Sequence, residues 1–193
     1  MRAMKKTAAT LKIVAVIAAF LAAAACNPVE KGAKSESILI VQSITGTLAD
    51  GVTTAMILES DVSVVKSDVA AVTLKASMLE PSGGVSGPSQ YNDINLTGYK
   101  VDYTLPDGTG VPGTTVPLPI TGASSSLLIK VGESKTVSLV VVLDSQKLAA
   151  PLAALMGTTT RLQVIAKITI EGQDLIGHTL QTTGQLTIFF GDY

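Results

Sequence analysis

The stretch that decides the fold is Asp68-Val69-Ala70-Ala71-Val72-Thr73-Leu74-Lys75-Ala76-Ser77-Met78-Leu79. From Val72 onward its apolar side chains stand two residues apart, with Thr73, Lys75 and Ser77 between them. Successive side chains of a β-strand point to opposite faces, so this alternation predicts a strand with one buried and one solvent-facing side.

Further apolar segments of strand length lie on both sides of this stretch. They are residues 38–44, 53–58, 96–105, 127–129, 137–143, 162–170 and 185–190. The segments 127–129 and 137–143 flank Gly132-Glu133 and predict a hairpin. Seven or eight short strands separated by turn residues indicate an all-β fold, and we expect an immunoglobulin-like antiparallel β-sandwich.

One short connector helix is expected after residue 143. Asp144 or Ser145 can cap it, and Gly157 can end it. Its apolar face would be formed by Leu148, Leu152 and Leu155. Because Pro151 falls in its middle, the segment is either a kinked helix or two short turns.

The N-terminus has the organisation of a lipoprotein signal peptide. Four basic residues (Arg2, Lys5, Lys6 and Lys12) come first, and the 13 apolar or small residues 13–25 lead to Cys26. A membrane-spanning helix needs roughly 18 or more such residues, so a cleaved signal is the better interpretation. We therefore expect a lipoprotein signal peptide at 1–25, a lipidated Cys26 that begins a flexible tether at 26–36, and a β-sandwich domain at 37–193.

The predicted lipid fixes an expected location. A lipidated Cys26 would attach the mature chain to a membrane of the bacterial cell envelope. Asn27 follows the cysteine where an aspartate would favour retention in the inner membrane, so the outer membrane is favoured.

Composition excludes several functions. Without residues 1–25 the chain has ten basic and fifteen acidic residues, a net charge of −5, which argues against nucleic acid as a partner. The only cysteine is the predicted lipid site, which leaves no disulfide and no cysteine metal site. His178 is the only histidine. We therefore expect no metal centre, no cofactor and no catalytic residues.

Two resemblances extend this interpretation. The segment Leu96–Gly108 resembles the third strand of a fibronectin type III domain, which implies the same sandwich architecture. A longer pattern resembles a family of uncharacterised bacterial lipoproteins, for which the resemblance implies no activity. That pattern runs through Glu59–Val62, Asp68–Leu74, Tyr99, Pro106–Gly108, Val111–Gly113 and Ile170–Gly177.

Polar residues of two loops form the candidate binding pole. Loops 81–95 and 171–178 would meet at one end of an immunoglobulin-like sandwich. Their candidate residues are Asn92, Asp93, Asn95, Asp174 and His178. These oxygen atoms either belong to solvated turns or hold calcium.

Two functions follow from these features. The preferred hypothesis is a lipid-anchored, non-enzymatic interaction or structural module that contacts another envelope protein through this pole or an exposed edge strand. The alternative is a small-ligand or carbohydrate-binding sandwich, assisted by calcium. An enzyme is not expected, because the sequence brings no convergent set of ionisable groups together.

Overall fold

Strands dominate residues 35–79 and 89–193, the part of the chain described by the computed structural model. The strands are β1 (Ser37–Thr47), β2 (Thr54–Ala55), β3 (Ile57–Asp61), β4 (Asp68–Met78), β5 (Ile94–Thr104), β6 (Ile120–Ile129), β7 (Ser134–Val142), β8 (Leu162–Asp174) and β9 (Thr179–Gly191). Three short helical turns accompany them: η2 (Gln90–Asn92), α2 (Asp144–Lys147) and η3 (Leu152–Leu155). The predicted signal peptide, Cys26 and residues 27–34 of the tether lie outside the described residues, as do 80–88.

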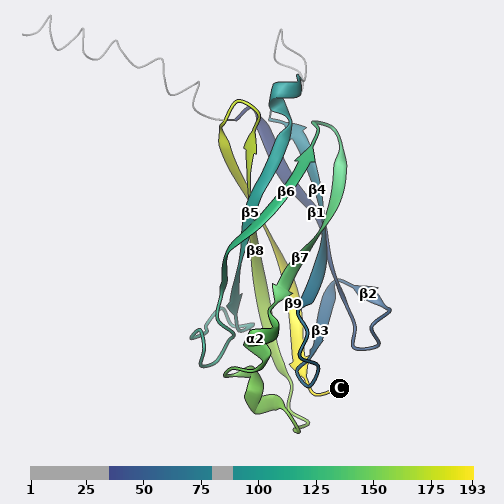
Figure 1. Ribbon diagram of the computed structural model, residues 1–193, viewed down its shortest axis with the longest axis vertical. Helices are drawn as coiled ribbons and strands as arrows, with labels where there is room; N and C mark the ends of the chain where they lie inside the picture. Colours follow the sequence, from purple (N-terminus) through teal and green to yellow (C-terminus); the bar gives the residue numbers. More distant parts are fainter. Residues whose placement is uncertain (1–34, 80–88) are drawn as a thin grey trace, which may run out of the picture. The chain divides into compact units, whose positions relative to one another are not determined.

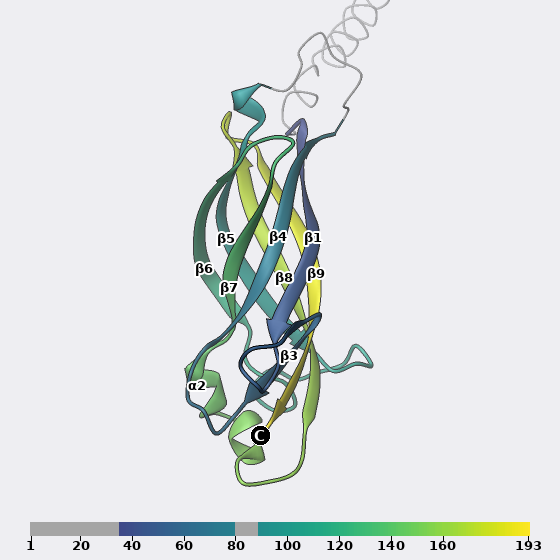
Figure 2. The same cartoon turned by 90° about the vertical axis from the view of Figure 1, so that its right-hand side faces the viewer.

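The strands form two sheets that pack face to face (Figures 1 and 2). One sheet has the order β2-β1-β4-β7 and the other β3-β9-β8-β5-β6. This arrangement confirms the all-β sandwich prediction. The order is that of an immunoglobulin-like sandwich, in which β1, β4 and β7 face β5, β8 and β9, and β6 extends the second sheet.

One strand pair runs parallel. β3 lies beside β9 with Ile57 opposite Thr187 and Asp61 opposite Gly191, whereas the other strand pairs are antiparallel. The chain therefore changes sheets early: β1 and β2 belong to the first sheet, and β3 joins the second. The predicted single strand 53–58 is interrupted at Met56, whose side chain is exposed.

The alternation that predicted β4 is confirmed. Ala70, Val72, Leu74 and Ala76 are completely buried, and the residues between them are less buried. In β5 the predicted face is also buried, because Tyr99, Val101 and Tyr103 point into the core.

The predicted hairpin at 127–143 is wrong. β6 and β7 belong to different sheets, so the chain crosses from one layer to the other between them. Gly132-Glu133 does form a turn, but it bonds to the end of β4: the Gly132 N–H donates to the Ala76 carbonyl at 2.9 Å. Two consecutive apolar segments have the same pattern whether they pair with each other or pack across the core.

The connector forms two short turns, α2 and η3, as Pro151 allows. Leu152 and Leu155 are buried, but Leu148 is 60% exposed, so the expected helical face is wrong at that position. The capping expectation is also wrong. The Gln146 side chain accepts the Leu143 N–H at 2.7 Å, in place of a cap by Asp144 or Ser145.

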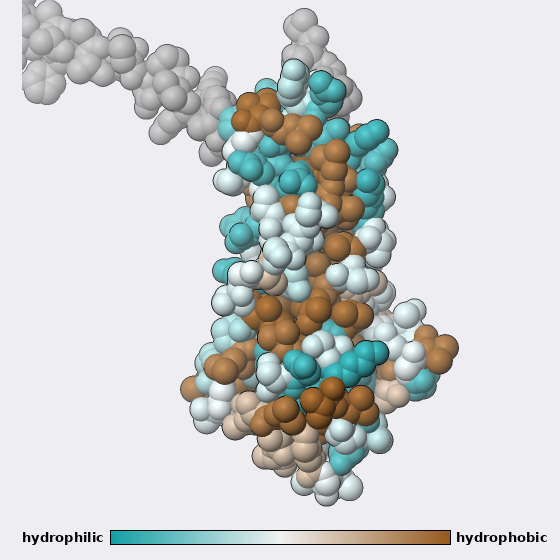
Figure 3. Space-filling model, in the orientation of Figure 1, coloured by the Kyte–Doolittle hydropathy of each residue, from teal (hydrophilic) through white to brown (hydrophobic). Residues whose placement is uncertain are grey.

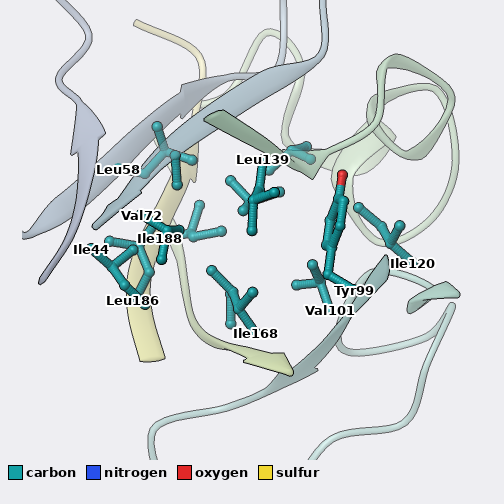
Figure 4. Close-up of a cluster of buried hydrophobic side chains, with 14 of the residues drawn as sticks. Ile44, Leu58, Val72, Tyr99, Val101, Ile120, Leu139, Ile168, Leu186 and Ile188 are labelled. Atoms are coloured by element: carbon teal, nitrogen blue, oxygen red, sulfur yellow. The ribbon is translucent and has the colours of Figure 1, made fainter. Parts of the chain in front are cut away.

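The core lies between the sheets, and Figure 4 shows a central part of it. Tyr99 crosses this core from β5 to β7, where its hydroxyl donates to the Val140 carbonyl (3.2 Å) and accepts the Val140 N–H (3.1 Å). Both backbone groups of Val140 are thus satisfied at the edge of the first sheet. Burial raises the pKa of Tyr99, although the Val140 hydrogen bond opposes this effect.

Gly46 marks a close approach of two strands. A Cβ atom at this position would lie 2.6 Å from the Leu58 Cβ and 2.7 Å from the Ile57 carbonyl oxygen. Only glycine allows β1 and β3 to approach this closely where the chain changes sheets.

Candidate functional site

The strands run between two ends of the sandwich. The N-terminal end carries Ser35 and the turns 89–93, 130–133 and 174–178. The C-terminal end carries Tyr193 and the loops 48–53, 62–67, 105–119 and 143–161. Figures 1 and 2 show the C-terminus beside α2, at the opposite end from the β8–β9 turn.

Asp174 organises the β8–β9 turn at the N-terminal end. Its Oδ1 accepts the backbone N–H groups of Ile176 (3.1 Å), Gly177 (2.9 Å) and His178 (2.8 Å). Its Oδ2 lies 3.0 Å from Nδ1 of His178. Burial acts to raise the pKa of Asp174, but hydrogen bonds from the His178 backbone, from Ser35 and from the His178 ring hold that pKa below its ordinary value.

Asn92 and Asp93 connect further segments at the same end. The Ser37 hydroxyl donates to the Asn92 carbonyl at 2.7 Å, and the Asn92 side-chain oxygen accepts the Ser89 N–H at 3.1 Å. Asp93 Oδ1 accepts the Val131 N–H at 3.0 Å. These hydrogen bonds therefore connect β1 to the turn 89–93, and that turn to the turn 130–133.

The structure brings four of the five predicted pole residues to one end. Asn92, Asp93, Asp174 and His178 lie in the turns of the N-terminal end, whereas Asn95 lies within β5 opposite Gln173. Asn95 is half-buried, and with Thr97 and Ser124–Ser126 it lines a shallow hollow beside β6.

Side-chain oxygen atoms of Asn92, Asp93 and Asp174 already have internal partners. Asp174 and Asp93 accept backbone N–H groups, which makes them turn-building carboxylates. Among residues 35–79 and 89–193, no three His, Cys, Asp or Glu side chains are grouped closely enough to hold a metal ion.

Sequence reasoning missed an ion pair between a buried lysine and a half-buried aspartate at the C-terminal end. Lys147 of α2 is 1% exposed, and its Nζ lies 3.0 Å from Oδ2 of Asp68. The same ammonium group donates to the carbonyls of Asp61 (2.8 Å) and Val64 (3.1 Å). Asp68 also accepts the Ser60 hydroxyl at 2.6 Å. No local spacing in the sequence signals this contact, because Lys147 and Asp68 are joined only by the fold.

Exposed apolar side chains lie in the loops that are hydrogen-bonded to α2 and at the end of α2 itself. Lys147 holds the loop that contains Val64, and the Gln146 side chain donates to the Leu118 carbonyl, so two loops are fixed against one helical turn. The exposed fractions are 51% for Val64, 51% for Val65, 55% for Leu118 and 60% for Leu148. We call these four residues the α2 patch. Figure 3 shows apolar residues on this end of the visible face, around a small polar group.

A groove of about 310 Å³ lies beside the patch. The loops 47–51 and 64–69 form two of its walls, and Glu59, Asp61 and Lys147 are among its polar lining residues. The Lys147 ammonium is engaged by three internal partners, Asp68 and the carbonyls of Asp61 and Val64, so it is not free to act on a molecule in this groove.

Comparisons with protein-family models and with curated proteins return no match. Within residues 35–79 and 89–193, no helix has the length and apolar character that crossing a bilayer requires. The fold and the contacts of the two ends therefore carry the functional argument.

Proposed function

We propose that the protein is a lipid-anchored, non-enzymatic interaction module of the bacterial cell envelope. The lipid on Cys26 attaches it to a membrane, with the outer membrane favoured, and the α2 patch binds an envelope protein. The chain belongs, in this proposal, with the bacterial lipoproteins whose sequence pattern it resembles.

The observation that carries the proposal is the position of the two ends. The chain from Cys26 joins the domain at Ser35, so the N-terminal end lies nearest the proposed anchor. β8 has 13 residues and spans roughly 40 Å, which separates the α2 patch from that end. The α2 patch therefore lies at the end of the domain that is farther from the proposed point of attachment.

The side chains of the α2 patch support a protein partner. Large aliphatic groups beside a helical turn are typical of the apolar centre of an interface, and polar groups surround such centres. Asp107 and Asp144 are exposed in the same loops. Lys66 and Arg161 are exposed there too, so the partner is expected to offer an apolar surface with polar groups of both charges around it.

Site-specific crosslinking in bacterial cells tests this function. A photoreactive amino acid at Leu148 should give one discrete crosslinked product in the membrane fraction, and the additional substitution Leu118→Asp should abolish it. The same label at Lys100, exposed in the middle of β5, is the matched control and should give none. Loss of membrane attachment should follow Cys26→Ser. A free thiol at Cys26 in the mature protein refutes the anchor, and equal products at Leu148 and Lys100 refute the patch.

A further inference from the structure

The β8–β9 turn exposes two adjacent aliphatic side chains. Leu175 is 49% exposed and Ile176 is 61% exposed, at positions where turns ordinarily carry polar residues or glycine. Asp174 binds the N–H groups of Ile176, Gly177 and His178, which fixes the backbone of the turn. The turn therefore holds both side chains outward, and they cannot fold back onto the core without breaking these bonds.

Two further apolar side chains lie at the same end. The Leu175 N–H donates to the Tyr91 carbonyl at 3.2 Å, so Tyr91, 57% exposed, belongs to the same surface. Leu79 is 59% exposed, and its N–H donates at 2.7 Å to the carbonyl of Glu36, where the chain joins the domain. We call Leu79, Tyr91, Leu175 and Ile176 the N-terminal patch.

The length of the chain between Cys26 and Ser35 limits how far the N-terminal patch can lie from the proposed anchor. Eight residues lie between Cys26 and Ser35, and the nine residue-to-residue steps span at most about 30 Å when the chain is extended. If Cys26 carries lipid, as proposed above, Ser35 is always within that distance of the bilayer, and Leu79 of the patch is hydrogen-bonded to the next residue, Glu36. A tyrosine beside aliphatic side chains is also the composition of protein surfaces at the membrane–water interface.

We propose that the N-terminal patch docks on the lipid bilayer, with Leu175 and Ile176 inserted at the level of the headgroups. This inference rests on the proposed anchor at Cys26. Docking would turn a flexible attachment into a fixed orientation that points the α2 patch away from the membrane.

The charges of this end specify the kind of lipid surface. Glu36, Lys130 and Glu133 are exposed charged residues in its described turns, and they form no basic cluster. Recognition of anionic lipids uses clusters of lysine and arginine. Docking is therefore expected on zwitterionic phosphatidylcholine and should be insensitive to salt.

Fluorescence depth measurements test the docking. The lipidated chain carrying Ile176→Cys is labelled with the environment-sensitive dye NBD and reconstituted into phosphatidylcholine vesicles that contain spin-labelled lipid. Leu148→Cys at the opposite end is the matched control, because the two side chains are 61% and 60% exposed. We expect blue-shifted emission, quenching by the spin-labelled lipid and protection from iodide at position 176 only. Adding Leu175→Ser should lower the ratio of docked to undocked protein about tenfold.

The outcomes separate the two proposals. If the protein floats with the vesicles but iodide quenches both labels equally, docking is wrong and the anchor stands. If the protein without an added cysteine takes up the dye at Cys26 and stays in the aqueous phase, the anchor is wrong and the docking falls with it.

Discussion

Replacing Asp174 with alanine should unfold the β8–β9 turn and weaken the whole domain. The substitution removes the acceptor for the N–H groups of Ile176, Gly177 and His178, at 3.1, 2.9 and 2.8 Å. A hydrogen bond to a charged group contributes about 1.5–3 kcal/mol, and the three bonds share one oxygen, so they do not add fully. We expect a loss of about 3 kcal/mol in the free energy of unfolding, which lowers Tm by roughly 9 °C for a domain of this size.

The pH dependence has a defined sign. The pKa of Asp174 is lower in the folded protein than its ordinary value, because the N–H groups stabilise the carboxylate against the opposing effect of burial. The folded state therefore binds this proton less readily than the unfolded chain. The contribution of Asp174 to stability is complete above about pH 4 and is lost as the pH falls through the folded-state pKa.

Urea unfolding followed by circular dichroism measures both effects, since the chain has no tryptophan. Asp174→Asn keeps one acceptor oxygen without the charge and should lose about 1 kcal/mol. Asp107→Ala is the control, because Asp107 Oδ1 accepts the Thr109 N–H (2.9 Å) in an exposed turn, where water can replace it. The reasoning is refuted if Asp174→Ala is no more destabilised than Asp107→Ala, or if its deficit is the same at pH 7 and at pH 3.

Two further substitutions test the contacts that hold the sheets together. Lys147→Met should destabilise the domain by about 3 kcal/mol, because the half-buried carboxylate of Asp68 loses its cation and the carbonyls of Asp61 and Val64 lose their donor. The double variant Lys147→Met/Asp68→Leu should recover part of this loss in urea titrations, and a double variant worse than the sum of both singles would contradict the ion-pair account. Gly46→Ala should cost about 1–3 kcal/mol in a thermal unfolding experiment, because the added Cβ overlaps Leu58 and the Ile57 carbonyl. An unchanged Tm would show that β1 and β3 separate easily.

The sequence predicts the strands well and their partners poorly. Alternation in β4 and β5 reports which face of each strand is buried, and that depends only on neighbouring residues. Pairing depends on the whole chain, which is why 127–129 and 137–143 resemble a hairpin although β6 and β7 lie in different sheets. Pro151 predicted that the connector is either a kinked helix or two short turns, but nothing in the sequence predicted that Leu148 is exposed.

The candidate site, too, was predictable from the sequence in part only. Grouping of Asn92, Asp93, Asp174 and His178 at one end follows from the strand order of an immunoglobulin-like sandwich. The sequence pattern does not distinguish an oxygen that is free for a ligand from one that builds a turn, and here Asp174 builds a turn. The aliphatic pair Leu175-Ile176 between Asp174 and Gly177 was a readable signal, since such positions are ordinarily polar.

The parallel pairing of β3 with β9 has a consequence for biosynthesis. β3 ends at Asp61 and its neighbour β9 ends at Gly191, 130 positions further along the chain, so the second sheet cannot be completed until both segments have been synthesised. Contacts between such distant parts of a chain form late and slowly. If the chain is exported as the proposed anchor at Cys26 requires, this strand order keeps the second sheet incomplete until β9 has also crossed the membrane.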